Sequence, residues 1–179
     1  MVKLNASESN IARNIARRIV SALTAQGYDA ELLVPEEEDI SLQERCRRVN
    51  TWCRQLGKDN VILISIHINA AGRGGRWMDA RGWCAYTTRG NTRADRLATC
   101  LYNAASHHLP GMRLRTDYTD GDPDLEKNFY ILLHTAAPAV LSESLFMDNQ
   151  ADCDFLLTAE GQQSLVDLHV EGITNYLAE

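Results

Sequence analysis

The nearly unbroken apolar run VILISI, residues 61–66, most constrains what this chain can fold into. Asp59 and Asn60 precede the run, and the small residues AAGRGG follow shortly after it. A short run without polar alternation is typical of a strand that is buried on both faces, as in a parallel sheet covered by helices. His67 and Asn69 stand where this strand ends, and this placement calls for an explanation.

Amphipathic helices are predicted before the run. Apolar residues recur every four positions near the N-terminus, which indicates a helix with Ser7 as its N-cap and Gly27 just past its end. The residues of this stripe are Ile11, Ile15, Ile19 and Leu23. Ser41 and Glu44 form a capping-box pattern ahead of a second amphipathic helix, which Gly57 ends.

Helical and strand-like segments alternate along the rest of the chain. Further helices are predicted over residues 91–109 and after Thr158, and further strands at YDAELLV (28–34), GWCAYTT (82–88) and PAVLSESLF (138–146). This alternation predicts the α/β class, with a largely parallel twisted sheet flanked by helices on both faces. The length of 179 residues suits one domain over residues 1–179, and no internal repeat or linker divides it.

Composition excludes some functions. The net charge of -6 gives no electrostatic reason to expect a nucleic-acid partner. The five cysteines are scattered without a C-x-x-C pair, so we expect free thiols in a reducing compartment. The N-terminal segment lacks the apolar stretch of a signal peptide, and no run approaches the roughly 18 apolar residues of a transmembrane segment.

Two side chains are candidates for chemistry at the end of the predicted sheet where ligands bind, beyond the carboxyl ends of the strands. A lone histidine such as His67 is more often structural than functional. Glu143 lies among leucines on one face of its strand, and a glutamate is almost never fully buried unless its charge is paired. It is either salt-bridged to an arginine or held ready for acid–base or metal chemistry. Glu8 would open the first helix, where the helix dipole alone favours a carboxylate.

Three segments carry a family resemblance: SIHINAA around His67, LQERCRRVN (42–50), and the long C-terminal segment that begins PAVLSESLFMDN (138–149). Together they resemble the zinc-dependent N-acetylmuramoyl-L-alanine amidases of the amidase-3 type. Enzymes of this family cleave the amide between N-acetylmuramic acid and L-alanine in peptidoglycan. The S-x-H-x-N-A and P-A-V-L-x-E segments, in this order, form a fairly specific pair.

The resemblance implies roles for four residues. By position, His67 and Glu8 match zinc ligands, Glu143 matches the catalytic glutamate, and Asn69 matches an asparagine that shapes the substrate site. The implied cofactor is Zn²⁺, which would keep an open position for water and lower the pKa of that water. The implied partner is peptidoglycan.

One part of the family pattern is absent. The resemblance implies an N-terminal strand leading into a G-H-G-G-like turn, whose histidine is the first zinc ligand. Before Glu8 the chain has only MVKLNAS, which contains no histidine and leaves, by this interpretation, no room for the strand. We therefore expect weak zinc binding. We also expect an exposed sheet edge, through which the chain self-associates unless its own N-terminal residues fill the gap.

The remaining histidines do not replace the missing ligand. His134, in LLHTAAP, is the one that could approach Glu143, whereas His107 and His108 end a helix and His169 belongs to a helix as a surface or packing residue.

The sequence leaves alternatives open. A chain of this kind would be made in the cytoplasm without a signal peptide and act on the cell wall, as a phage-type lysin or as a secreted enzyme without its leader. A non-catalytic wall-binding domain that keeps the fold, or a metallopeptidase acting on small peptides, are the alternative functions.

Overall fold

The computed structural model describes residues 1–6, 10–72 and 75–179. Within these residues a six-stranded sheet forms the centre of the molecule, in the order β2-β1-β3-β6-β4-β5. The strands are β1 (Val2–Ala6), β2 (Ala30–Leu32), β3 (Ile62–Asn69), β4 (Trp83–Thr87), β5 (Leu125–Glu126) and β6 (Ala139–Phe146). The pairs β1–β2, β1–β3, β3–β6 and β4–β5 are parallel, and β4 runs antiparallel to β6. The predicted α/β class with a largely parallel sheet is confirmed.

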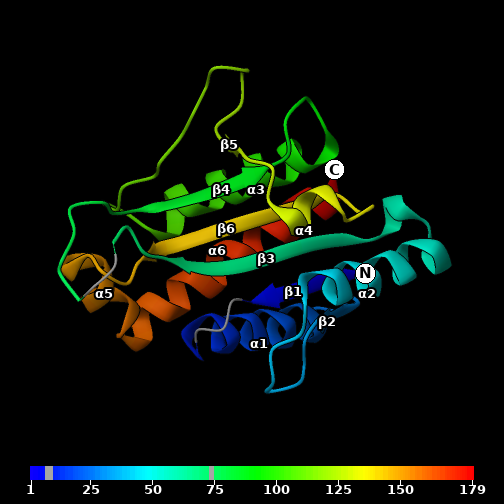
Figure 1. Ribbon diagram of the computed structural model, residues 1–179, viewed down its shortest axis with the longest axis horizontal. Helices are drawn as coiled ribbons and strands as arrows, with labels where there is room; N and C mark the ends of the chain where they lie inside the picture. Colours follow the sequence, from blue (N-terminus) through cyan, green and yellow to red (C-terminus); the bar gives the residue numbers. More distant parts are fainter. Residues whose placement is uncertain (7–9, 73–74) are drawn as a thin grey trace.

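Helices cover both faces of this sheet (Figure 1). They are α1 (Asn10–Ala25), α2 (Leu42–Leu56), the single 3-10 turn η1 (Lys58–Asn60), α3 (Arg93–His108), α4 (Tyr130–Leu133), α5 (Gln150–Leu156) and α6 (Ala159–Ala178). One core cluster joins α1, α3 and α6 to even-numbered residues of β3 such as Ile64. The other joins α2 and α4 to Leu63 of β3 and Leu141 of β6. Because side chains alternate along a strand, Ser65 and His67 share the face of Leu63.

The prediction that the N-terminal strand is missing is wrong. Residues Val2–Ala6 form β1, which pairs with β2 on one side and β3 on the other. Asn5 stands opposite Ser65 in the β1–β3 register, and Ala6 stands opposite Ile66. The gap between the predicted strands is thus filled by the chain's own N-terminal residues, and the edge of β3 that was expected to be open is paired.

Most of the local signals have their expected outcome. Ser41 caps α2 by accepting a hydrogen bond from the backbone N–H of Glu44, and Thr158 caps α6 through the N–H of Gly161. The proposed cap Ser7 lies outside the described residues. All five cysteines, which lie within the described ranges, are free thiols. No helix in the described part of the chain is long and apolar enough to cross a membrane.

Candidate active site

His67 and Glu143 lie side by side near the carboxyl ends of the two central strands. They are Cα partners in the parallel pair of β3 and β6. Partners in adjacent parallel strands project from the same face of a sheet, so the two side chains rise from the face that carries α2 and α4. Both residues are partly buried. The structure thus brings together two of the four predicted site residues.

Glu143 has the properties of an acid–base group. Burial raises the pKa of its carboxyl to about 7, although the positive charges of Arg115 and Lys127 oppose that rise. Its Oε2 atom is buried and has no hydrogen-bond partner in the described structure. No described basic side chain forms an ion pair with it, which leaves the alternative of a structural salt bridge without support. A carboxyl that titrates near neutral pH can both accept and return a proton.

His67 is neutral in this environment. Burial lowers the pKa of its imidazole to about 4, and the positive charge of Arg45 lowers it further. Its Nε2 atom lies 3.1 Å from the hydroxyl oxygen of Ser65, two positions earlier on the same face of β3. The imidazole is therefore held by a hydrogen bond from its own strand rather than by Glu143.

A buried polar chain extends from Ser65 towards α2, and sequence reasoning missed it. The side-chain amide of Asn5 donates to Ser65 Oγ over 2.7 Å, and Arg45 donates from Nη1 to Asn5 Oδ1 over 2.5 Å. Arg45 also forms an ion pair with Asp39. Asn5 and Arg45 are only 2% and 5% exposed. An asparagine inside the otherwise strand-forming VKLNA segment was the one signal that could have indicated a buried polar contact.

Asn69 lies just beyond His67, at a bulge in the β3–β6 pairing. His67 pairs with Glu143, but Asn69 pairs with Phe146, so β6 carries one extra residue in this interval. Leu145, within the bulge, is buried and has a φ of 70°, a conformation that leucine rarely adopts. The side-chain oxygen of Asn69 accepts from the N–H of Ala70 over 2.8 Å, so the side chain stabilises the turn out of β3. Its predicted contact with substrate stays a prediction.

The segments beyond β3 and β6 are tied together by Asp148. Its Oδ2 atom accepts from the backbone N–H groups of Ala71 and Gly72, each over 2.8 Å. Its carbonyl oxygen accepts from the N–H of Met78 over 2.7 Å. The segment that follows β3 is thereby attached to the turn that follows β6, next to the His67–Glu143 pair.

The other histidines form contacts with residues outside the His67–Glu143 pair. His134 follows α4 before β6 begins, its carbonyl accepts from the side chain of Asn50, and its ring lies against that of Tyr130. Its approach to Glu143 stays a prediction. His107 and His108 both bind Glu171 on α6. His169 is fully buried, as a packing residue, and bonds to Ser142.

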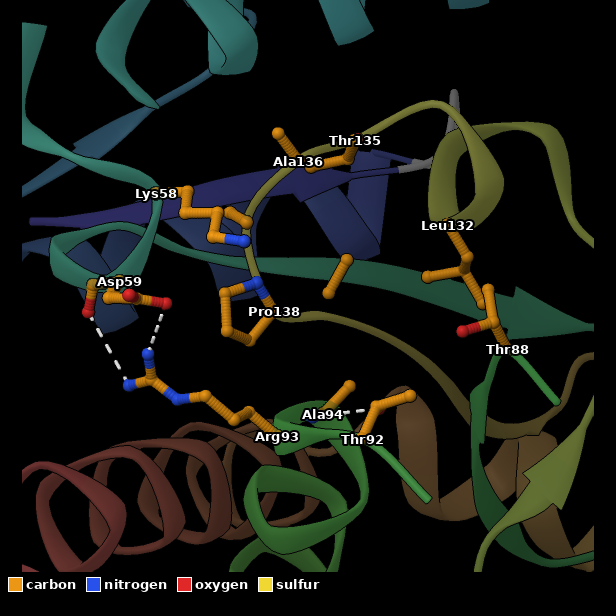
Figure 2. A pocket seen from close by; sticks show the side chains of 12 residues that line it. Lys58, Asp59, Thr88, Thr92, Arg93, Ala94, Leu132, Thr135, Ala136 and Pro138 are labelled. Atoms are coloured by element: carbon orange, nitrogen blue, oxygen red, sulfur yellow. Dashed lines mark hydrogen bonds and ion pairs between the residues drawn. The ribbon is translucent and has the colours of Figure 1, made fainter. Parts of the chain in front are cut away.

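A hollow of about 280 Å³ lies at the opposite ends of the central strands, where β3 and β6 begin (Figure 2). Lys58 and Asp59, which precede β3, and Pro138, which precedes β6, line it together with the start of α3. Figure 2 shows Arg93 turned towards Asp59, with Nη1 and Oδ1 2.6 Å apart. Lys58, Asp59 and Pro138 come before β3 and β6 begin, so this hollow is separate from the His67–Glu143 pair near the other ends of these strands.

The described residues do not fit a catalytic zinc site. Glu8, the second proposed ligand, lies outside the described residues. Within residues 1–6, 10–72 and 75–179, no group of three or more His, Cys, Asp or Glu side chains is arranged to hold a metal ion. The connection from β1 to α1 spans only residues 7–9, SES, and so contains no histidine. A catalytic zinc usually has three protein ligands, and this donor set does not supply them.

Comparison with known proteins agrees with the fold. The chain is 25% identical over 172 residues to an endolysin of Bacillus phage SPP1, and 27% identical over 168 residues to a sporulation-specific N-acetylmuramoyl-L-alanine amidase of Bacillus subtilis (strain 168). These matches cover 95% and 93% of this chain but 58% of each relative, so the chain spans little more than half the length of these curated relatives.

Solved structures show the same architecture. An N-acetylmuramoyl-L-alanine amidase from Clostridium difficile 630 superposes with a TM-score of 0.75 at 22% identity, covering 99% of this chain and 96% of that one. The amidase AmiC2 of Nostoc punctiforme gives a TM-score of 0.78 at 20% identity, covering 100% and 98%. The sequence pattern of the family itself matches residues 2–175. On this match, the chain belongs to the N-acetylmuramoyl-L-alanine amidase family.

Proposed function

We propose that residues 1–179 form a hydrolytic domain that acts on the cell wall and cleaves the amide between N-acetylmuramic acid and L-alanine in peptidoglycan. The observation that carries the proposal is Glu143, a buried carboxyl with an unpartnered oxygen and a pKa raised to about 7. Glu143 is the register partner of His67, near the carboxyl ends of the two central strands. The chain belongs to the N-acetylmuramoyl-L-alanine amidase family.

Glu143 supplies the proton transfers of the proposed reaction. As a carboxylate it accepts a proton from the water that attacks the amide carbonyl carbon. As a carboxylic acid it then returns that proton to the leaving nitrogen of L-alanine. A pKa near neutrality suits both half-reactions because both protonation states of the carboxyl are populated near pH 7. Asn69, which shapes the turn out of β3, is the proposed substrate-binding residue.

Zn²⁺ is the cofactor that the family resemblance implies, and Glu8 and His67 are the ligands that the resemblance assigns to it. The described donors do not fit a three-ligand site, as shown above.

A digestion experiment tests the proposed activity. Purified sacculi are incubated with the protein, and new L-alanine amino termini are quantified beside new reducing sugar ends. Hydrolysis of the proposed amide produces amino termini without reducing ends. The proposal fails if the yield of amino termini is no higher than with a Glu143→Gln variant of equal stability.

A second candidate function is a wall-binding domain without catalysis. The hydrogen bond between His67 and Ser65 favours it, because a neutral histidine that is bonded within the protein can have a purely structural role. Cosedimentation with sacculi, without release of amino termini, would support this candidate over hydrolysis.

A further inference from the structure

Arg45, Asn5, Ser65 and His67 form one continuous chain of hydrogen bonds from α2, through β1, to β3. We infer that this chain fixes His67 as the neutral tautomer with its hydrogen on Nδ1. His67 then serves the site as a hydrogen-bond donor beside Glu143, and not as a zinc ligand. Arg45, Asn5 and Ser65 are thus positioning residues for the site of the proposed hydrolase.

The direction of the first bond is set by Arg45. A guanidinium carries only donors, so the atom of Asn5 that lies 2.5 Å from Arg45 Nη1 must be the amide oxygen. The amide nitrogen of Asn5 then faces Ser65, 2.7 Å away, and donates to its hydroxyl oxygen. Asp39 and the carbonyl of Ile40 hold the guanidinium in place at the other end.

The direction of the last bond follows from Ser65. Its side chain is fully buried, and its oxygen already accepts from Asn5. The acceptor left for the hydroxyl hydrogen among its described contacts is His67 Nε2, 3.1 Å away. The opposite arrangement, in which Nε2 donates to Ser65, would leave a buried hydroxyl hydrogen without an acceptor, which folded proteins avoid.

This arrangement has two consequences for the site. A neutral imidazole has one ring nitrogen with an available lone pair, and in the inferred tautomer the hydroxyl of Ser65 occupies it. A metal could bind Nδ1 only if the ring changed tautomer, and Nε2 would then donate to Ser65 and leave the buried hydroxyl hydrogen without an acceptor. The inferred tautomer carries the hydrogen of the ring on Nδ1, which has no hydrogen-bond partner in the described structure. Because His67 and Glu143 are register partners, a neutral donor and an acid–base carboxyl lie next to each other. A donor of this kind can stabilise negative charge that develops on a carbonyl oxygen.

Long-range proton–nitrogen NMR spectra of the full chain test the tautomer, since protonated and unprotonated ring nitrogens resonate in separate ranges. The signals of His67 are identified by their loss in His67→Gln. We expect a protonated Nδ1 and an unprotonated Nε2 in the unmodified chain. In Ser65→Ala we expect both nitrogen signals to shift towards the average of two exchanging tautomers. A hydrogen on Nε2 in the unmodified chain would overturn the inference even if Ser65→Ala failed to fold.

The protein offers a matched control. Ser142 on β6 is also fully buried and its hydroxyl lies 2.8 Å from Nε2 of His169. Ser142→Ala should shift the ring signals of His169 and leave those of His67 unchanged. Equal shifts of His67 in the two serine variants would mean a general loosening of the core and would count against a specific chain of bonds.

A titration with zinc sulfate completes the test. One equivalent of zinc should leave the ring signals of His67 in place, whereas tight coordination through either ring nitrogen would move them and refute the inference. Neither readout requires wall substrate. A chain with the inferred tautomer and no hydrolysis of sacculi would contradict the proposed function alone, and a hydrolytic chain with the other tautomer would contradict this inference alone.

Discussion

Glu143 stands directly opposite His67 in the parallel pairing of β6 and β3, so a carboxyl and an imidazole from distant parts of the chain share one face of the sheet. The pairing continues only briefly, because the bulge at Leu145 changes the register immediately afterwards. The two side chains therefore lie at the last regular position of the central strand pair. This is the edge at which sheets of this class bind ligands.

Replacing Glu143 by glutamine should abolish wall hydrolysis and leave the fold intact. The amide has the shape of the carboxyl but accepts no proton from water, and general-base catalysis contributes about 10²–10⁴-fold to rates. The fold should tolerate the change because no described side chain forms an ion pair with Glu143. Release of amino termini from sacculi is measured beside thermal melts, with Glu160→Gln, an exposed position in the first turn of α6, as the control. If the loss of activity is accompanied by a large fall in melting temperature, Glu143 has a structural role instead.

The pH dependence of hydrolysis should follow the pKa of Glu143. The carboxylate is the form that accepts a proton, so kcat/KM should rise with pH through about 7, where burial has placed this pKa. Lys127 opposes the effect of burial because its positive charge favours the carboxylate. Lys127→Met should therefore move the midpoint of the profile to higher pH. The matched control is Lys58→Met, an exposed lysine at the other edge of the sheet, which should leave the midpoint in place. If the midpoint is the same in Lys127→Met as in the unmodified chain, the group that titrates in the profile is not Glu143.

A histidine-bearing turn should raise zinc affinity when it is placed after β1. The carboxyl end of β1 lies at Ala6, opposite Ile66 and next to the site, whereas Met1 lies at the other end of this strand. We expect a Gly-His-Gly insertion between Ala6 and Asn10, combined with Ser65→Ala to release the lone pair of His67, to bind zinc more tightly than the unmodified chain. Calorimetric titration measures the difference. The same segment added before Met1 should have no effect, and equal affinities for the two insertions would contradict this placement of the site.

Gly172 should be irreplaceable where α6 crosses α3. A Cβ at this position would lie 2.7 Å from Leu101 Cδ2 and 2.8 Å from Leu101 Cα. A leucine methyl group can rotate away, but a backbone atom can move only with its helix, so Gly172→Ala should cost about 1–3 kcal/mol of unfolding free energy as an overpacked core does. Helix propensity alone would favour alanine over glycine by about 1 kcal/mol. Urea denaturation distinguishes the two effects, with Asn175→Ala on the exposed side of α6 as the control. A more stable Gly172→Ala variant would show that the two helices can separate without cost.

The sequence by itself determined the elements whose signals are local. The stripe of isoleucines predicts α1, the capping pattern at Ser41 predicts α2, and the apolar run before His67 predicts a strand with two buried faces. These signals are readable because periodicity and caps act between residues a few positions apart. The same patterns, with the family resemblance, also identified His67 and Glu143.

Only the tertiary structure decided what depends on contacts between distant segments. The local pattern of VKLNA did not lead to the prediction of a strand, and the segment becomes β1 because β2 and β3 supply hydrogen-bond partners on both sides. The antiparallel direction of β4 and the bulge after Glu143 likewise follow from pairing and not from composition. The chain from Arg45 through Asn5 and Ser65 to His67 joins three elements that are far apart in the sequence. A hydrogen bond depends on distance and direction in space, and these exist only once the sheet has assembled.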